Sequence, residues 1–166
     1  MDEIIVTRMD KIRPIHHNEH EKYEYYRHDV TKREYKYEAA SPKEGNQTVV
    51  AFYTIPPGKS NYPFHYHTAN EEVFYIISGC GILETPNGTR PVTAGDIIVC
   101  PVGQGGAHKI TNSSSEADLT YLDVDTNNTP DIAFYPHTNK AGIRAVGGIR
   151  ANFNLDSKVD YYDSEL

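Results

Sequence analysis

The sequence has 166 residues, which suits one domain with its own hydrophobic core. Its net charge of −7 argues against a nucleic-acid partner, because a protein that binds a polyanion needs a basic surface. No apolar stretch is long enough to cross a membrane, and the start, Met1 to Glu3, lacks the basic and apolar segments of a secretion signal. We therefore expect a cytoplasmic protein that contacts no membrane.

The amino-acid usage favours strands over helices. The chain has 13 Tyr and no Trp, and Val, Ile and Thr supply most of the remaining β-forming residues. Its two cysteines, Cys80 and Cys100, are predicted to be free, packed thiols, because a cytoplasmic chain gives no reason to expect a disulfide.

Residues 1–46 are predicted to form an N-terminal extension. Residues 1–22, with the polar cluster His16 to His20, read as a solvated loop. The segment Tyr23 to Tyr37 is rich in Tyr and in charge, and we expect edge strands there that meet a second subunit, since Tyr covers apolar surface while its hydroxyl stays wet. A turn is expected at Ser41 to Asn46. These features predict a homodimer.

Residues 47–125 carry short strand signals separated by turn signals, a pattern typical of an all-β sandwich or barrel. The run Val73 to Ile77 is apolar on both faces, so it is buried on both sides or packs on the core with one face and on a partner with the other. A hairpin is expected with Asn87-Gly88 at its centre. The predicted strands are Gln47–Ile55, Val73–Ile77, Ile82–Glu84, Ile97–Cys100, Lys109–Asn112 and Leu119–Val124, the last clear one.

Two histidines begin a candidate metal site. In an extended strand alternate side chains share a face, so His65 and His67 project two imidazoles the same way. A carboxylate follows at Glu72 after a short turn, and a third imidazole comes at His108. Three imidazoles and one carboxylate suit one divalent transition metal per chain, such as Fe, Mn, Ni or Zn, with coordination positions left for a small molecule.

This spacing resembles the two motifs of the cupin superfamily. In the first motif one extra residue separates Gly58 from His65, and in the second the loop Gln104 to Ala107 has four residues where two are expected. The matching residues are Gly58, His65, His67, Glu72 and Gly79, then Gly95, Pro101, Gly103, His108 and Asn112.

The resemblance implies an antiparallel double-stranded β-helix, or jelly-roll barrel, over residues 47–125. It also implies that His65, His67, Glu72 and His108 are the metal ligands. Glu71 is the alternative carboxylate, but the spacing to Gly79 favours Glu72 and turns Glu71 outward. Aromatic candidates for the mouth of the site are Tyr53, Tyr62, Phe64 and Tyr75.

Residues 126–166 lose strand periodicity and are expected to wrap the barrel as a tail or cross to a partner. The tail contains Tyr135-Pro136 and Lys140, which resembles a subgroup of small single-domain cupins, some of them labelled sugar-phosphate isomerases. The last residues, 157–166, are expected to fray.

Three functions stay open at this point, and no catalytic residue is identified. The metal could bind a substrate through two adjacent oxygens and polarise it. Isomerisation also needs a base, which the motif does not supply, whereas a dioxygenase needs only the metal and a dry apolar pocket. The sequence therefore favours a dioxygenase over an isomerase, and a non-catalytic protein that binds a small molecule is the third reading.

Overall fold

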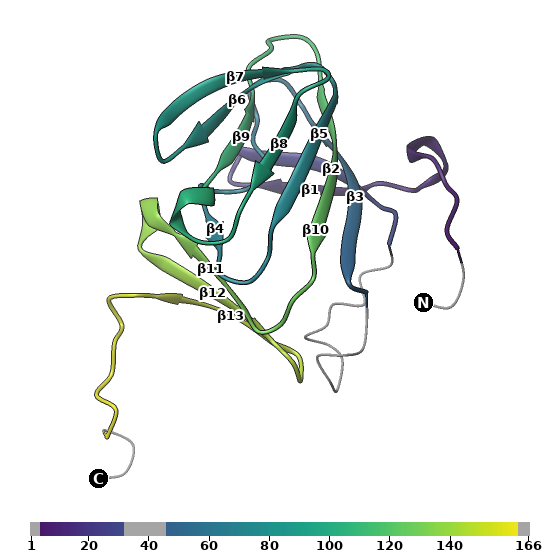
Figure 1. Cartoon of the computed structure of the whole chain (residues 1–166). Coiled ribbons are helices and arrows are strands. Elements are labelled where there is room, and N and C mark those ends of the chain that lie inside the picture. Colours follow the sequence, from purple (N-terminus) through teal and green to yellow (C-terminus); the bar gives the residue numbers. More distant parts are fainter. Residues whose placement is uncertain (1–3, 32–45, 163–166) are drawn as a thin grey trace.

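The computed structural model describes residues 4–31 and 46–162, which form three antiparallel sheets (Figure 1). The largest sheet has six strands in the order β1-β2-β3-β10-β5-β8. In that order, the strands are Ile15–Glu19, Tyr23–Asp29, Thr48–Ile55, Leu119–Thr126, Glu72–Ser78 and Ile97–Cys100.

Two smaller sheets complete the fold. One has the order β13-β12-β11-β4, with bounds Ile149–Asn154, Lys140–Ala145, Asp131–Tyr135 and Tyr66–His67. The other has the order β7-β6-β9, with bounds Gly88–Thr93, Cys80–Thr85 and Lys109–Asn112. Short 3-10 turns lie at Met9–Lys11 (η1), Gln104–Gly106 (η2) and Pro136–Thr138 (η3). The predicted all-β, antiparallel double-stranded β-helix is confirmed.

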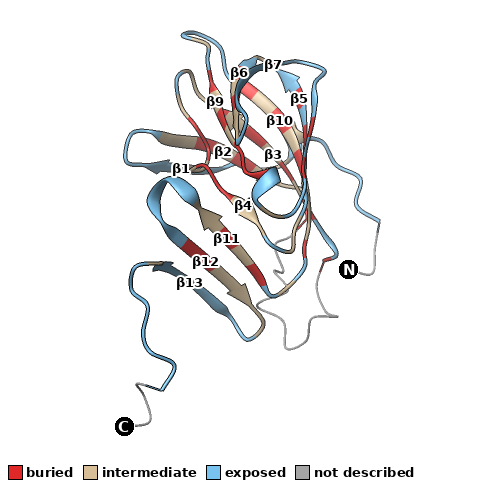
Figure 2. Ribbon diagram, turned by 60° about the vertical axis from the view of Figure 1, so that its left-hand side comes forward, coloured by how far each residue is buried: buried red, intermediate tan, exposed pale blue. Residues whose placement is uncertain are grey.

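The core lies on the inner face of the large sheet, where buried and less buried residues alternate along the central strands β3 and β10 (Figure 2). On β3 the buried positions include Tyr53 and Ile55, and on β10 they include Leu119 and Tyr121. Alternation follows from the two-residue period of a strand. The predicted strands of residues 47–125 are thus present with small shifts at their ends.

Strand β5 carries apolar residues on both faces, but only one face is buried. Phe74 and Ile76 point into the core, whereas Tyr75 and Ile77 are 45% and 41% exposed. Of the two readings of this run, the structure therefore fits the one in which only one face packs on the core of the chain itself.

The N-terminal histidines lie in a strand, so the loop predicted at His16 to His20 is wrong for most of its length. Strand β1 pairs with β2 from Ile15↔Arg27 to Glu19↔Tyr23, and the ring of His16 stacks on Tyr26 with centroids 4.5 Å apart. Backbone pairing at the sheet edge decides the conformation here, and it leaves no mark on the sequence. The strand predicted from Tyr23 is present as far as Asp29, but it lies between β1 and β3, so the edge strand is β1. Residues 32–37 of that segment and 41–45 of the predicted turn lie outside the described residues.

The predicted hairpin is present, but its centre is one residue earlier than expected. Thr85 pairs with Gly88, so Pro86 and Asn87 are the central residues. The reason is that proline has a fixed φ of about −65°, which favours the first central position of an ordinary β-turn, so the turn forms at Pro86-Asn87. Gly88 follows with a positive φ of 110°.

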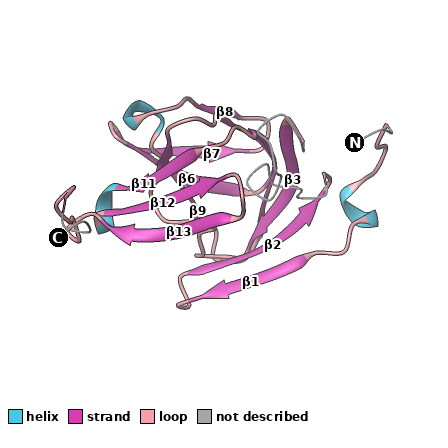
Figure 3. Cartoon of the chain, turned by 90° about the horizontal axis from the view of Figure 1, so that it is seen from below, coloured by secondary structure: helices cyan, strands magenta, loops and turns pink. Residues whose placement is uncertain are grey.

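Strands β11 to β13 were not predicted, and the expectation that Leu119–Val124 is the last clear strand is wrong. These strands pair in sequence, and β11 also pairs with β4 through Ala133↔His67 and Phe134↔Tyr66. Their residues are largely small, polar or exposed, with β13 exposed almost throughout, so no alternating apolar pattern marks them. Figure 3 shows β11, β12 and β13 side by side.

The two cysteines are free, but only Cys100 is buried. Burial raises the pKa of the Cys100 thiol, which makes it inert. Cys80 is exposed, so the prediction that it is packed is wrong. Within residues 4–31 and 46–162, no helix has the length and apolar character required to traverse a membrane.

Candidate metal centre

Backbone pairing brings two of the predicted ligands together. His65 and His108 form a β-bridge in which each backbone N–H donates to the other residue's carbonyl, at 3.1 and 2.9 Å. Their rings lie 4.8 Å apart between centroids. His67 follows on the short strand β4, and its ring centroid is 5.2 Å from that of His65, as the shared-face argument predicted.

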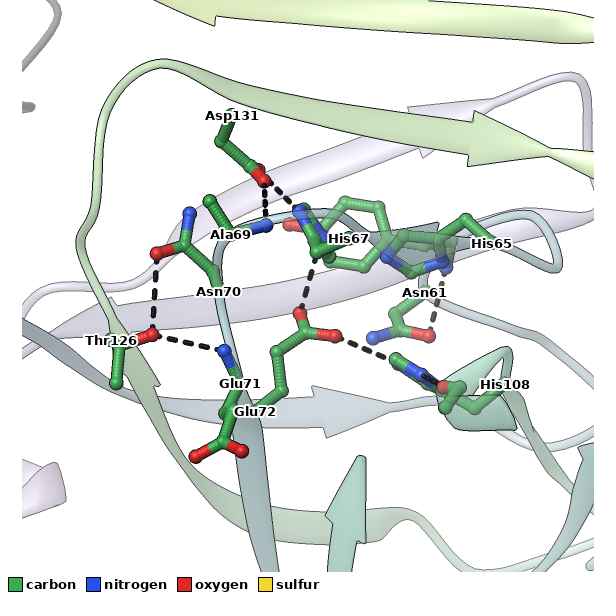
Figure 4. Close-up of polar contacts among 12 residues, drawn as sticks. Asn61, His65, His67, Ala69, Asn70, Glu71, Glu72, His108, Thr126 and Asp131 are labelled. Carbon is green, nitrogen blue, oxygen red and sulfur yellow. Dashed lines mark hydrogen bonds and ion pairs between the residues drawn. The ribbon is translucent and has the colours of Figure 1, made fainter. Parts of the chain in front are cut away.

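Glu72 lies between the imidazoles (Figure 4). One potential ligand atom from each of His65, His67 and Glu72 lies within 4.8 Å of the other two, so these three residues could hold a metal ion. His108 is not in this group, but its Nε2 lies 3.2 Å from Oε2 of Glu72. Oε1 of the same carboxylate is 3.7 Å from Nε2 of His67.

Glu71 is on the opposite side of the chain from these groups. Its side chain is exposed and points away from the imidazoles in Figure 4. Its backbone N–H donates to Oγ1 of Thr126 at 2.9 Å. The structure thus brings Glu72, and not Glu71, to the histidines.

The three histidines all use Nδ1 for a hydrogen bond, which tests whether they suit a metal. The acceptors are the carbonyls of Pro63 and Gly106, at 2.8 and 2.9 Å from His65 and His108, and the carboxylate of Asp131, at 2.5 Å from His67. Because each acceptor fixes a proton on Nδ1, Nε2 is the atom of each ring that can offer a lone pair to a metal when the ring is neutral. Ligand histidines in metalloproteins are oriented in the same way, so the donor set fits a transition metal.

Burial controls the protonation of these residues. It lowers the pKa of His65 well below the ordinary value and that of His108 to about 4, so both rings are neutral at pH 7. Burial opposes the charged form of His67 as well, but the hydrogen bond to Asp131 and the charge of Glu72 raise its pKa to about 9. Burial also raises the pKa of Glu72, to about 8. A proton held by this pair has to leave when a metal binds.

A cavity of about 200 Å³ opens beside the cluster and gives a small molecule room to enter. Tyr53 and Tyr62 line it, as expected for two of the aromatic candidates, whereas Tyr75 is on the outer face and Phe64 lines a different cavity. The polar residues of its wall are Asn70, Asp123, Asp125, Thr126, Asn127, Asn128, Thr129, Asp131, Arg144 and Arg150.

Sequence reasoning missed Asp131 and Tyr135, which come from β11. Oδ1 of Asp131 accepts from the N–H of Ala69 at 3.0 Å while Oδ2 accepts from His67. The ring of Tyr135 stacks on His65 with centroids 5.8 Å apart. The Tyr-Pro pair at 135 and 136 was a signal for this strand, but nothing in the sequence pointed to Asp131.

Asp131 should tune the site, and we expect Asp131→Asn to weaken Zn²⁺ binding about 10- to 100-fold. An amide puts an NH2 donor in place of one carboxylate oxygen, so it cannot accept at both of the positions that face His67 and Ala69. The measurement is competition for Zn²⁺ against a chelating dye. Asp96→Asn makes the same chemical change at an exposed turn, and an equal loss in both variants would contradict a specific role for Asp131.

Comparisons with known proteins agree with this fold. The family model described as "Cupin domain" matches residues 51–125. An oxalate-binding protein from Thermotoga maritima is 36% identical over 70 residues, which are 42% of this chain and 54%, about half, of that protein.

Solved structures with the same fold cover more of the chain. A sugar phosphate isomerase of the cupin superfamily from Silicibacter pomeroyi superposes with a TM-score of 0.73 and 19% identity over 95% of this chain and 98% of that one. An uncharacterized protein with a double-stranded β-helix domain from Klebsiella pneumoniae gives a TM-score of 0.54 and 22% identity over 76% and 93%. At these identities the likeness concerns the fold alone.

Proposed function

We propose that this chain, which belongs to the cupin superfamily, binds one divalent transition metal together with a small, oxygen-rich organic molecule. The observation that carries the proposal is the group of His65, His67 and Glu72 beside an open cavity. We assign His108 as the fourth ligand because its Nε2 also faces Glu72. Fe, Mn, Ni or Zn suits this donor set.

The residues of the chain divide the work of such a site. The bound metal would supply Lewis-acid polarisation of the ligand's oxygens. The hydrogen bonds at Nδ1 of the three histidines hold the rings in place, and the stacked ring of Tyr135 covers His65. The likeness to an oxalate-binding protein supports a ligand with adjacent oxygens.

Among possible reactions, the cavity wall supports isomerisation over dioxygenation. The reading as a dioxygenase relied on a dry apolar pocket, but besides Glu72 this wall carries three aspartates, two arginines and several amides. Asp125 pairs in register with Glu72 across β10 and β5, which brings a carboxylate base close to the ligand position. That is the group which the motif alone did not supply.

Deuterium exchange distinguishes these reactions. An isomerase that removes a proton next to a carbonyl replaces that C–H by C–D in D₂O, so the ¹H NMR signal of a hydroxy aldehyde or ketose should disappear with Mn²⁺- or Zn²⁺-loaded protein. Oxygen uptake by the Fe²⁺-loaded protein with diketones or catechols, and no exchange, would favour the dioxygenase instead. Saturable binding without either reaction would leave the non-catalytic reading, and no binding by any loaded form would contradict the proposal.

A homodimer remains our prediction, and so does a cytoplasmic location. The outer face of β5 and β8 carries four exposed apolar side chains, Tyr75, Ile77, Ile97 and Val99, with Tyr75 opposite Ile97. Such a patch is typical of an interface. This face is a candidate in addition to the N-terminal strands.

We expect light scattering to give the mass of two chains for the native protein and of one chain for Ile97→Lys. Ile97 is 68% exposed, so the substitution should not disturb the fold. Ile4→Lys changes an equally apolar, 94% exposed residue outside the sheets and should stay dimeric. A monomeric native protein would refute the prediction.

A further inference from the structure

Two arginines lie opposite each other on neighbouring strands of the four-stranded sheet. Arg144 on β12 and Arg150 on β13 are directly paired in register. Like charges placed opposite each other in a sheet repel and reduce its stability. Among the residues that the structure describes, no ion pair joins either guanidinium to a carboxylate. The repulsion between the two arginines is therefore not offset by an ion pair with any described residue.

The same two arginines line the cavity that contains the metal cluster. Both charges also act on Tyr135, where they oppose the rise in pKa that burial causes, and Tyr135 stacks on His65. A Cβ built at Gly142 would lie 3.4 Å from Nη1 of Arg144 and 3.5 Å from Cε2 of Tyr135, so the ring that stacks on His65 is also close to Arg144. An oxyanion at the arginines and a chelating group at the cluster could belong to one small molecule.

Glycine at position 142 leaves room for this arrangement. A Cβ built there would come 2.6 Å from Oδ1 of Asn152 and 3.4 Å from Nη1 of Arg144, so both side chains pass over the bare backbone. Nη1 of Arg144 donates to the carbonyl of Ile143 at 2.9 Å, which holds the guanidinium. Arg144 is partly buried and Arg150 is exposed, as expected at the open end of a cavity.

The acidic residues of the cavity do not neutralise the charges of the two arginines. Asp131 is paired in register with Arg144, but both of its oxygens accept hydrogen bonds from His67 and Ala69. Asp123 and Asp125 lie on β10, which pairs with β5, the strand that carries Glu72 of the metal cluster. Charge is therefore divided along the cavity, with cations on β12 and β13.

We propose that Arg144 and Arg150 bind a second oxyanion, a carboxylate or a phosphate, of the molecule whose chelating end occupies the metal cluster. This inference rests on the proposed function and narrows its ligands to small anionic chelators. Arginine suits the task, because its fork donates two parallel hydrogen bonds to a carboxylate or phosphate.

Three α-hydroxy acids that share one chelating end test the inference. Glycerate, malate and 3-phosphoglycerate differ only in whether the third carbon carries a hydroxyl, a carboxylate or a phosphate group. Calorimetric titration into the Zn²⁺-loaded protein should show malate, 3-phosphoglycerate or both binding about 10- to 100-fold tighter than glycerate, as charge-assisted hydrogen bonds predict. The acid with the higher affinity identifies whether the arginines bind a carboxylate or a phosphate.

In Arg144→Gln, and separately in the exposed Arg150→Gln, this preference should fall to less than about threefold. Arg144→Lys should keep part of it, since the charge remains and the fork is lost. Arg90→Gln, which removes the same charge on β7 away from this cavity, should keep it whole. Equal affinities for all three acids, or a preference that survives both glutamine substitutions, would overturn the inference and leave the proposed function standing. Failure of every acid to bind would contradict the proposed function itself.

Discussion

The double variant His65→Ala, His67→Ala should contain almost no metal, whereas the native protein should contain about one equivalent per chain. Sites with four such ligands bind Zn²⁺ with about 10 kcal/mol or more, so losing two ligands is expected to weaken binding by more than about 1,000-fold. Elemental analysis of the purified proteins is the measurement.

The control for this experiment comes from the N-terminal histidines. His16→Ala, His20→Ala also removes two imidazoles, but from the edge strand β1 and the turn after it, where His16 contacts Glu24. This control should keep the native metal content. Equal metal in the two double variants would remove His65 and His67 from the site, and circular dichroism would show whether each variant is folded.

The cluster of His65, His67 and Glu72 could be predicted from sequence because most of its geometry is local. His65 and His67 are two residues apart, so strand alternation turns them to one side, and the motif spacing to Gly79 identifies Glu72, which begins the next strand, as their carboxylate partner. His108 needed the resemblance to a known motif, since its place is fixed by a bridge to His65, 43 positions earlier in the chain, and no periodicity encodes that pairing.

The rest of the site depends on contacts distant in sequence. Asp131 reaches His67 from 64 residues away. It lies on the five-residue strand β11, whose buried positions are Asp131 and Ala133, so no row of large apolar residues marks the inward face. Arg144 and Arg150 meet only because β12 and β13 pair in one register. A β-sheet places such residues by strand order and register, which a single sequence does not reveal for short, exposed strands.

The loop before His108 shows how an unexpected insertion can serve the site. Its residues Gln104 to Gly106 form the 3-10 turn η2, and the carbonyl of Gly106 accepts the hydrogen bond from Nδ1 of His108. The N–H of Gly103 donates to the carbonyl of His67 at 2.7 Å, so the loop also packs against the second histidine. The loop that contains the two extra residues therefore helps to hold two predicted ligands, His67 and His108, in place.

We expect Gly106→Ala to disrupt this support and Gly105→Ala to leave it intact. A Cβ at position 106 would lie 1.8 Å from the carbonyl oxygen of Pro101, a backbone atom that cannot rotate away, whereas a Cβ at position 105 meets nothing within 4 Å. Overpacking of this kind costs about 1–3 kcal/mol or more, and the backbone shift that relieves it moves the carbonyl that orients His108.

Zn²⁺ competition and thermal unfolding measure the two consequences. Gly106→Ala should bind Zn²⁺ at least about 10-fold more weakly, as loss of an orienting partner predicts, and should unfold at a lower temperature. Gly105→Ala should match the native protein in both. If Gly106→Ala unfolds earlier but binds Zn²⁺ with native affinity, the turn supports the fold without positioning His108. That result would mean that the backbone bridge to His65 is enough to position His108.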